Sequence, residues 1–398
     1  MKELNVGVIG LGMRGSDMLM HVINIPGVKV TALCDLYSDR IEKASDSIYN
    51  EKGYRPGLTT TDYNELIESD NVEVVMVFAA WEAHIPAAIA SMKNKKPVAV
   101  EVAGAYSIQQ CWDLVKTYEE TNTPIMMLEN CCYGRTEMML KNMINQGVFG
   151  TLVHFDGAYC HDLRREVSGG IKNRHYRLRN YKNRNCDNYP THELGPIAQM
   201  LEINRGNRLL SLTSTASKGV GLKEYIKEKH SDDEYLCSLD FAQGDVITTT
   251  IKCAHGETIT IVLDTTLPRY YTRNLCVHGT KALYDDRVEA FYIDGEVGVE
   301  HEWNFKGCWG NIEKYREKYE HPVWKKYLDE GVKSGHGGMD WLVLNAFFDS
   351  LRANAPMPID VYDMATWMAI TPLTEKSISL GSMPVEIPDF TNGKWHKE

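Results

Sequence analysis

The sequence predicts an α/β protein whose N-terminal part forms a parallel, doubly wound sheet and whose second part is an α/β domain with a largely antiparallel, open sheet. In the first third, short apolar strands alternate with helices of about 10–15 residues, which is typical of a parallel sheet with crossover helices. From about residue 151 onward, strand candidates follow one another without long helices between them. We therefore expect two domains, at residues 1–130 and 131–398, with the C-terminal helices packing back on the first domain.

The expected elements follow from apolar periodicity and from the residues that interrupt it. In the first domain we expect strands at 6–9, 29–34, 73–79, 97–101 and 124–128, and helices ending near 24 and spanning 38–51, 83–93 and 108–121. In the second domain we expect strands at 152–159, 236–241, 246–253, 258–264 and 275–277, and helices at 193–204, 338–352 and 363–380. An open sheet with one uncovered face favours a homo-oligomer, because a wide exposed apolar face is a liability.

Composition and charge exclude several classes of protein. The chain of 398 residues has 43% hydrophobic and 24% charged residues, which is ordinary for a globular protein and unlike a disordered one. Its 43 Lys and Arg against 54 Asp and Glu give a net charge of −11, whereas nucleic-acid binding needs a basic face. The basic stretch 164–184 is the exception, and its interleaved Gly and Tyr favour a substrate-side loop over a solvated surface or an RNA contact.

The apolar runs, the N-terminus and the cysteines of the chain bear on its compartment and metal content. No apolar run reaches the roughly 18 residues of a membrane helix, and the N-terminus enters a strand almost at once, which leaves no room for a signal peptide. We expect a cytoplasmic protein, or a periplasmic one if a leader has been removed. The ten cysteines contain no Cys-x-x-Cys pair, so the sequence predicts reduced thiols and no metal site. His161-Asp162 has no second pair at ligand spacing and is not taken as a metal site either.

A glycine motif follows the first expected strand. Gly10-x-Gly12-x-x-Gly15 opens a helix, and Asp35 ends the next strand twenty residues beyond the third glycine. In a dinucleotide-binding Rossmann fold these glycines give a tight turn, bare backbone for the pyrophosphate and close helix–strand packing, while the acid accepts bonds from ribose hydroxyls. Leu36-Tyr37 follows Asp35 instead of a basic pair, so NAD is favoured over NADP.

Two further segments end strands at the carboxyl edge of the same sheet, where ligands bind in open α/β folds. Trp81 and His84 begin the third crossover, and either side chain could contact the dinucleotide. Glu101 ends the next strand and is expected to point into the same crevice. A plain helix-start histidine and a surface carboxylate are the alternatives for His84 and Glu101.

These elements resemble the glucose–fructose oxidoreductase / inositol dehydrogenase superfamily, but two of its motifs are altered here. Most dehydrogenases of that superfamily carry Glu-Lys-Pro after the fourth long strand, and their lysine assists proton transfer; this chain has Glu101-Val102-Ala103. They also carry Asp-x-Gly-x-His in the second domain, where this chain has Asn188-Tyr189-Pro190-Thr191-His192. Both departures count against an ordinary sugar dehydrogenase.

A narrower resemblance is to glycoside hydrolase family 109, which comprises NAD-dependent α-N-acetylgalactosaminidases. It runs from near residue 5 to near 395 and is carried by several short motifs in the same order. They are Gly10-Leu11-Gly12-Met13-Arg14-Gly15, Trp81-x-x-His84, Val100-Glu101-Val102, Glu129-Asn130, Tyr189-Pro190-Thr191-His192, Leu267-Pro268-Arg269, His336-Gly337-Gly338-Met339-Asp340 and Ile387-Pro388-Asp389-Phe390.

The resemblance implies a hydrolase that keeps its NAD through the cycle. Oxidation at C3 of the sugar acidifies the C2 proton, a base removes that proton, the leaving group is expelled, and water addition and reduction complete hydrolysis with retention. An imidazole suits proton transfer near neutral pH. His192 is the expected proton mover at the C3 hydroxyl, and Tyr189 and Tyr159 are expected as sugar-hydroxyl partners or as the C2 base. A purely structural histidine at a helix start is the alternative for His192.

The resemblance also implies residues that line the two binding sites. The substrate is expected to contact Tyr159, Arg177, Tyr189, Pro190, Thr191, His192 and Tyr271. The cofactor is expected to contact Gly10, Gly12, Met13, Arg14, Gly15, Asp35, Trp81, His84, Glu101, Val102 and Asn130.

Two other functions stay open on the sequence. One is an NAD-dependent sugar or polyol dehydrogenase with net NAD reduction. The other is a non-catalytic NAD-sensing binding module. The expected partner in the preferred hypothesis is a small-molecule glycoside, with no nucleic acid.

Overall fold

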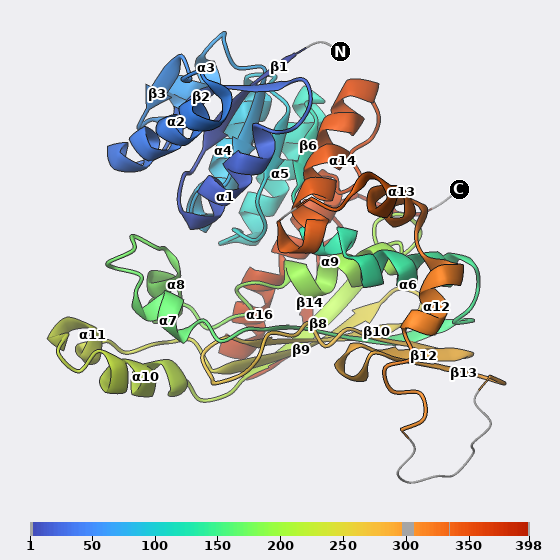
Figure 1. The fold of residues 1–398 in the computed structure, drawn as a ribbon. Helices are drawn as coiled ribbons and strands as arrows, with labels where there is room; N and C mark the ends of the chain where they lie inside the picture. Colours follow the sequence, from blue (N-terminus) through green and yellow to red (C-terminus); the bar gives the residue numbers. More distant parts are fainter. Residues whose placement is uncertain (1–2, 297–305, 334, 397–398) are drawn as a thin grey trace. The chain divides into compact units, whose positions relative to one another are not determined.

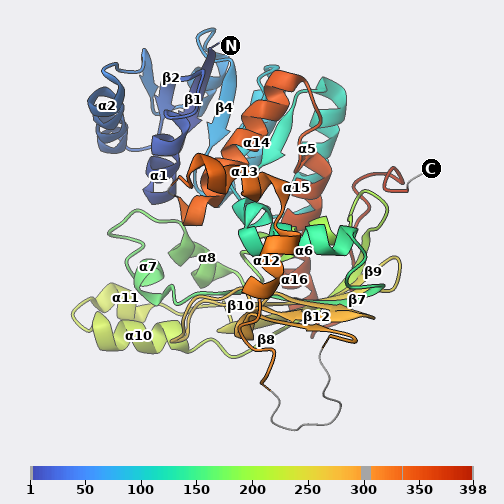
Figure 2. The same ribbon diagram turned by 45° about the vertical axis from the view of Figure 1, so that its right-hand side comes forward.

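The structure of the chain is a computed structural model that describes residues 3–296, 306–333 and 335–396. It divides into two compact units. The first contains the described residues up to Asn130 together with Val332–Ala369, and the second contains Cys131–Gly331 and the residues from Ile370 onward. Figures 1 and 2 show the elements of each unit from two directions.

A six-stranded sheet of parallel pairs forms the centre of the first unit, in the order β3-β2-β1-β4-β5-β6. The change of direction in the strand order lies between β1 and β4, and the inner strands are buried as a crossover sheet requires. Its strands are β1 (Leu4–Ile9), β2 (Val28–Cys34), β3 (Leu58–Thr60), β4 (Val74–Val77), β5 (Val98–Val100) and β6 (Ile125–Met127).

Helices flank this sheet in two groups. In one group α1 contacts α2 and α14; in the other α4 contacts α3 and α5, and α5 contacts α15. The two groups correspond to the two faces that right-handed crossovers cover when the strand order reverses. The helices are α1 (Met13–Val22), α2 (Ser38–Lys52), α3 (Tyr63–Glu68), α4 (Trp81–Lys93), α5 (Ile108–Thr121), α14 (Met339–Ala353) and α15 (Val361–Met368).

Two glycines allow the turn from β1 into α1. Gly10 has φ +92°, a left-handed conformation that favours glycine, and a Cβ there would clash with the backbone of Ala79. A Cβ on Gly15 would clash with the carbonyl oxygen of Gly10. The helix therefore packs against the strand more closely than any side chain would permit.

The second unit is built on an eight-stranded sheet in the order β13-β12-β11-β7-β10-β9-β8-β14. β7 and β10 are parallel, and the other pairs are antiparallel. Its strands are β7 (Leu152–Cys160), β8 (Leu209–Ala216), β9 (Val246–Cys253), β10 (Thr258–Asp264), β11 (Cys276–Gly279), β12 (Ala282–Asp285), β13 (Ala290–Ile293) and β14 (Val385–Glu386).

Two helices of the second unit, α9 and α16, pack on one face of that sheet. α9 contacts β7, α16 contacts β8, and α6 contacts α9, as Figure 1 shows. The opposite face carries the exposed Thr248, Thr250 and Lys252 on β9. The α-helices of this unit are α6 (Arg135–Asn145), α7 (Arg164–Ser168), α8 (Arg177–Asn183), α9 (Thr191–Met200), α10 (Gly221–Lys229), α11 (Glu234–Ser238), α12 (Glu313–Tyr319), α13 (Pro322–Glu330) and α16 (Ile370–Ser379).

The described residues of the two units also form the 3₁₀ helices η1 (Asn130–Tyr133), η2 (Asp286–Val288) and η3 (His336–Gly338).

The predicted fold class is confirmed, and several element predictions are wrong or incomplete. The segment expected as a strand at 236–241 is helical from Glu234, because the Asp233 side chain caps the helix by accepting from the Leu236 N–H at 2.9 Å. The single helix expected at 363–380 is two helices, α15 and α16. Pro372 lacks the N–H that would continue the first helix through this point. The short edge strand β3 and α3 were not predicted, since three strand residues give too little periodicity. The elements of the second unit that were also not predicted are β8, β12, β13, β14, α6, α7, α8, α10, α12 and α13.

Among the described residues, no helix is both long enough and apolar enough to cross a lipid bilayer. All ten cysteines are described, and none forms a disulfide.

The glycine turn makes a stability prediction with an internal control. We expect Gly15→Ala to lower the free energy of unfolding by about 3 kcal/mol or more, because its new Cβ meets backbone that cannot move aside. Gly12→Ala should cost less than about 1 kcal/mol, since φ is −66° and the nearest atom, Arg40 Nη1, is 3.6 Å away. Chemical denaturation of both variants measures this; equal losses would contradict the packing argument.

Candidate functional site

The N-terminus of α1 in the first unit has the features of a nucleotide cradle, which we define as Gly10–Gly15 together with Asp35. The first N–H groups of a helix have no intrahelical acceptor. Gly12, the N-cap of α1, has no side chain that could accept from them. A Cβ built on Gly12 would have Arg40 Nη1, at 3.6 Å, as its nearest neighbour, so a ligand could approach the backbone of Gly12 from this direction. Met13, the first helical residue, is largely exposed. This is the donor set and the open approach that a pyrophosphate needs.

Asp35 closes the cradle from the end of β2. Its Oδ2 accepts from the Leu11 N–H at 2.7 Å, and its Oδ1 accepts from the Tyr37 N–H at 3.0 Å. Arg40 Nη1 lies 3.7 Å from Oδ2, so the arginine nearest this carboxylate is already paired with it. The carboxylate oxygens retain lone pairs for ribose hydroxyls. The predicted role of Asp35 toward the ribose fits this placement.

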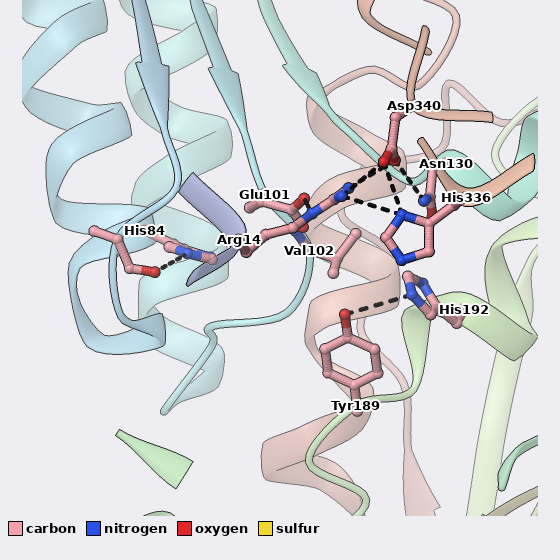
Figure 3. Close-up of polar contacts among 10 residues, drawn as sticks. Arg14, His84, Glu101, Val102, Asn130, Tyr189, His192, His336 and Asp340 are labelled. Carbon is pink, nitrogen blue, oxygen red and sulfur yellow. Dashed lines mark hydrogen bonds and ion pairs between the residues drawn. The ribbon is translucent and has the colours of Figure 1, made fainter. Parts of the chain in front are cut away.

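Arg14 is the centre of a polar network that joins distant segments of the first unit (Figure 3). Its Nε donates to Glu101 Oε1 at 2.6 Å, and its two Nη atoms donate to the two oxygens of Asp340 at 2.8 Å each. Asn130 Nδ2 and His336 Nδ1 also bond Asp340, at 2.8 and 2.7 Å. We call these five residues the Arg14 network.

The charges in the Arg14 network are mutually compensated. Burial opposes ionisation of Asp340, but the bonds from Arg14 and His336 outweigh it and hold the pKa of this carboxyl well below its usual range. Burial also disfavours the Arg14 cation, and Glu101 and Asp340 more than offset that effect, so the pKa of Arg14 is raised. The guanidinium is thus committed to two carboxylates and is a poor partner for a 2′-phosphate.

The remaining residues predicted to contact the cofactor are buried. Glu101 Oε2 accepts from the N–H of the buried Val102 at 2.8 Å. His84 is 2% exposed, and its two ring nitrogens lie 3.0 and 2.9 Å from the carbonyl oxygens of Ala103 and Ala79. Burial lowers the pKa of His84 despite both carbonyls. The structure thus gives His84 and the buried Trp81 structural positions at the start of α4, and their contact with a cofactor stays a prediction.

The second unit brings the predicted catalytic residues together. His192 lies in the first turn of α9, which begins at the buried Thr191 directly after the buried N-cap residue Pro190. Tyr189 Oη lies 3.4 Å from His192 Nε2, and the two rings meet edge to face with centroids 4.8 Å apart (Figure 3). A tyrosine and an imidazole at this distance can exchange a proton once a substrate tightens the contact.

Tyr159 forms a second tyrosine–histidine pair. Its Oη lies 3.2 Å from His161 Nδ1, and its ring centroid is 4.5 Å from that of Tyr189. Tyr271, half exposed, meets the His161 ring edge to face at 5.3 Å. With Tyr189 and His192 these residues form what we call the aromatic–histidine cluster.

Arg177 places a positive charge beside this cluster. Its guanidinium carbon is 5.0 Å from the Tyr189 ring centroid, and its Nε is 3.2 Å from Glu166 Oε1. Burial lowers the pKa of His161, and Arg177 lowers it further, which favours the neutral form of this imidazole. Arg164 and Arg184 pair with Asp162 and Glu375, so part of the charge of the basic stretch 164–184 is balanced within the unit.

A buried carboxyl precedes the cluster along the chain. Asp187 is fully buried; its Oδ1 accepts from the Tyr189 N–H at 3.2 Å, and its own N–H donates to Thr374 Oγ1 at 3.0 Å. Burial raises the pKa of Asp187 to about 7. Shifts of this size are common at functional sites.

Several residues of these sites were not found by sequence reasoning. His336 and Asp340 were noted as a motif and given no role, although Asp340 receives four bonds of the Arg14 network. His161 was considered only as a metal ligand. Asp187 gave no signal, because nothing in a lone Cys-Asp-Asn tripeptide reveals that the carboxyl is buried.

The fold and the cradle define an NAD-binding Rossmann domain joined to a second α/β unit. Residues 4–128 match the family model described as "Oxidoreductase family, NAD-binding Rossmann fold", and residues 133–397 match "Glycosyl hydrolase 109, C-terminal domain". The chain therefore belongs to glycosyl hydrolase family 109.

Curated relatives agree with this membership. A glycosyl hydrolase family 109 protein of Stenotrophomonas maltophilia is 38% identical over 99% of this chain and 90% of the relative. An α-N-acetylgalactosaminidase of Tannerella forsythia is 35% identical over 98% of this chain and 87% of the relative.

Solved structures confirm the fold at low identity. A levoglucosan dehydrogenase in complex with NADH and levoglucosan has a TM-score of 0.71 at 15% identity, covering 97% of this chain and all of that one. A myo-inositol dehydrogenase of Lactobacillus casei in complex with NAD(H) and myo-inositol has a TM-score of 0.64 at 15% identity, covering 98% of this chain and 99% of that one.

Asp187 predicts a pH dependence of stability. Because its pKa is about 7 when folded and near 4 when unfolded, the folded state retains a proton between these values. The stabilisation is complete below about pH 4 and is lost as the pH rises through 7, by up to about 1.4 kcal/mol per pH unit. Denaturation from pH 4 to 8 should show this slope in the wild type and a flatter one in Asp187→Asn.

The exposed Asp232→Asn serves as the matched control for this measurement and should keep the wild-type slope. A wild-type slope in Asp187→Asn would show that this carboxyl is not the titrating group.

Proposed function

We propose that the protein is an NAD-dependent glycosidase that removes terminal α-linked N-acetylgalactosamine or a closely related sugar. The observation that carries the proposal is the pair of tyrosine–histidine contacts in the second unit, Tyr189–His192 and Tyr159–His161. Family membership and the name of the Tannerella forsythia relative support the substrate. Ordinary glycosidases instead place two carboxylates about the anomeric carbon, and this cluster is built from phenols and imidazoles.

NAD, when bound in the cradle of the first unit, supplies a hydride acceptor that returns its hydride within the same turnover. The residues that would hold it are Gly10–Gly15 through backbone N–H groups and Asp35 through its carboxylate. The cradle fits the group because the N-cap of α1 is bare and Asp35 lies beside the same turn.

The chain's own residues must then move two protons, one at the C3 hydroxyl and one at C2 of the sugar. We assign the C3 hydroxyl proton to His192 with Tyr189, since an imidazole is both acid and base near neutral pH. We assign the C2 proton to Tyr159 with His161, whose neutral imidazole can accept it. Arg177 holds a positive charge near both phenols and would stabilise negative charge that develops on the sugar oxygens. Tyr271 offers an exposed ring to the sugar face.

A dehydrogenase with net NAD reduction is the second candidate, because sugar and polyol dehydrogenases share the fold. Val102 is an observation against this second candidate. The lysine that assists proton transfer in most of those enzymes is replaced here by a buried apolar side chain.

The two functions give different products. With an aryl α-N-acetylgalactosaminide we expect release of the aryl group without accumulation of NADH, and a deuterium label at C2 should exchange with solvent. The β-anomer and the galactoside without the acetamido group serve as controls of specificity. Sustained NADH production from free sugars would support the dehydrogenase, and no turnover of any glycoside would favour an NAD-sensing module; either result would refute the proposal.

His192 can be tested against another histidine of the same unit. We expect His192→Ala to lower kcat about 10²–10⁴-fold while leaving the NAD dissociation constant unchanged, because it removes a proton mover and no cradle residue. His230→Ala is the matched control, since His230 Nε2 bonds Ser168 Oγ at 3.1 Å outside the cluster. Steady-state kinetics and NAD titration measure both. Near-wild-type kcat in His192→Ala would remove this residue from the mechanism.

The quaternary state and compartment are further parts of the proposal. We propose a homo-oligomer, without assigning its interface to a particular face. The exposed Thr248, Thr250 and Lys252 make the open face of the second sheet more polar than the apolar surface expected from the sequence. We also propose a reducing compartment, because the ten cysteines are scattered along the sequence and contain no Cys-x-x-Cys pair.

A further inference from the structure

Four side chains that commonly bind metals meet on one face of the second sheet. β7 supplies His154 and Asp156, and the adjacent antiparallel strand β11 supplies Cys276 and His278. In the register of this pair Cys276 lies opposite Asp156, and His278 lies opposite His154. Because side chains alternate along a strand, all four project from the same face. We call them the cross-strand square.

Three members of the square have the spacing of a metal-binding set. Cys276 Sγ is 3.3 Å from His278 Nε2, and that nitrogen is 3.6 Å from Asp156 Oδ2. A ligand atom from each of the three lies within 4.8 Å of the other two. In a tetrahedral zinc site with bonds of about 2.0–2.3 Å, ligand atoms lie about 3.3–3.8 Å apart. Small rotations of these side chains would complete three corners of such a site.

The fourth member of the square holds one of these ligands in place. His154 Nε2 lies 3.1 Å from Asp156 Oδ1, and His154 Nδ1 lies 2.7 Å from Thr258 Oγ1 on β10. Hydrogen bonds of this kind orient the ligands of metal sites. Asp285, opposite Cys276 on β12, accepts two bonds from the Arg287 guanidinium and is committed there. The fourth corner is therefore left for water.

The donor set and the exposure favour a zinc-like ion. One thiolate sulfur, one imidazole nitrogen and one carboxylate oxygen suit a borderline-soft cation, whereas Ca²⁺ and Mg²⁺ prefer oxygen ligands alone. Cys276 is buried, but the side chains of His278 and Asp156 are 42% and 38% exposed, so an ion can reach the square from solvent.

The square is separate from the aromatic–histidine cluster. On β7 the alternate residues Phe155, Gly157 and Tyr159 face the other way, and a Cβ on Gly157 would contact Glu193 and Ile197 of α9. α9 also carries His192. The square thus lies on the face of β7 turned away from α9.

We propose that Asp156, Cys276 and His278 bind a zinc ion, with His154 as a positioning residue. The ion would link β7 to β11 and stabilise the second unit, because the ligands are brought together only by strand pairing in the folded state. This inference is independent of the proposed glycosidase activity.

The test uses the full chain after treatment with a chelator. Titration with Co²⁺ should give one equivalent of binding with a sulfur-to-cobalt charge-transfer band, and Zn²⁺ should displace the cobalt and raise the Tm. Cys276→Ser should abolish the band, and His278→Ala, at an exposed position, should weaken binding by 100-fold or more. His154→Ala should weaken binding about 10–100-fold and retain the band.

Cys237→Ser is the matched control, since this half-buried thiol of the same unit bonds the carbonyl of His230 away from the square. It should bind cobalt like the wild type. Wild-type protein that binds no more metal than Cys276→Ser, or a charge-transfer band that survives in Cys276→Ser, would overturn the proposal.

Discussion

The ion pairs of Arg14 with Glu101 and Asp340 are the constraint on which the first unit depends. Arg14 is half-buried, but the carboxylates of Glu101 and Asp340 are buried, and removing the partner of a buried charge typically costs about 3–5 kcal/mol. The two carboxylates come from the end of β5 and from the start of α14, more than 200 residues apart in the chain. The network thus ties the start of α14 to the parallel sheet, to which residues 332–369 are also joined by the packing of α14 on α1 and of α15 on α5 and β6. It leaves the backbone of the cradle to bind a phosphate.

β7 has a comparable role in the second unit, because its two faces carry different chemistry. Tyr159, near its end, joins the phenols and imidazoles assigned to proton transfer. His154 and Asp156, on the opposite face, belong to the square assigned to a metal. A strand permits this separation because successive side chains point to opposite sides, so a site on one face can change while the packing on the other is kept.

The sequence predicted features that depend on near neighbours and missed those that depend on tertiary pairing. The glycine turn and Asp35 were predictable because strand, turn and acid lie within 35 residues and follow a fixed spacing. The tyrosine–histidine pairs were found in part, since Tyr189 and His192 share one tetrapeptide, whereas His161 acquires its role only beside Tyr159 and Tyr271. The roles of Asp340 and Asp187 could not be predicted, because their burial and their hydrogen-bond partners in the folded chain decide their charge. The cross-strand square could not be predicted, because only the pairing register of β7 with β11 brings its residues together.

The proposed mechanism requires a bound nucleotide that is needed for cleavage and is not consumed. The direct measurement is the glycosidase rate of protein freed of bound nucleotide, before and after addition of NAD⁺ or NADP⁺. Arg14 is neutralised by its carboxylates, and Arg40 is paired with Asp35, so neither arginine is available for a 2′-phosphate. We therefore expect NAD⁺ to restore the rate without being consumed as substrate turns over, and NADP⁺ not to restore it. Full activity in the nucleotide-free protein would contradict the account.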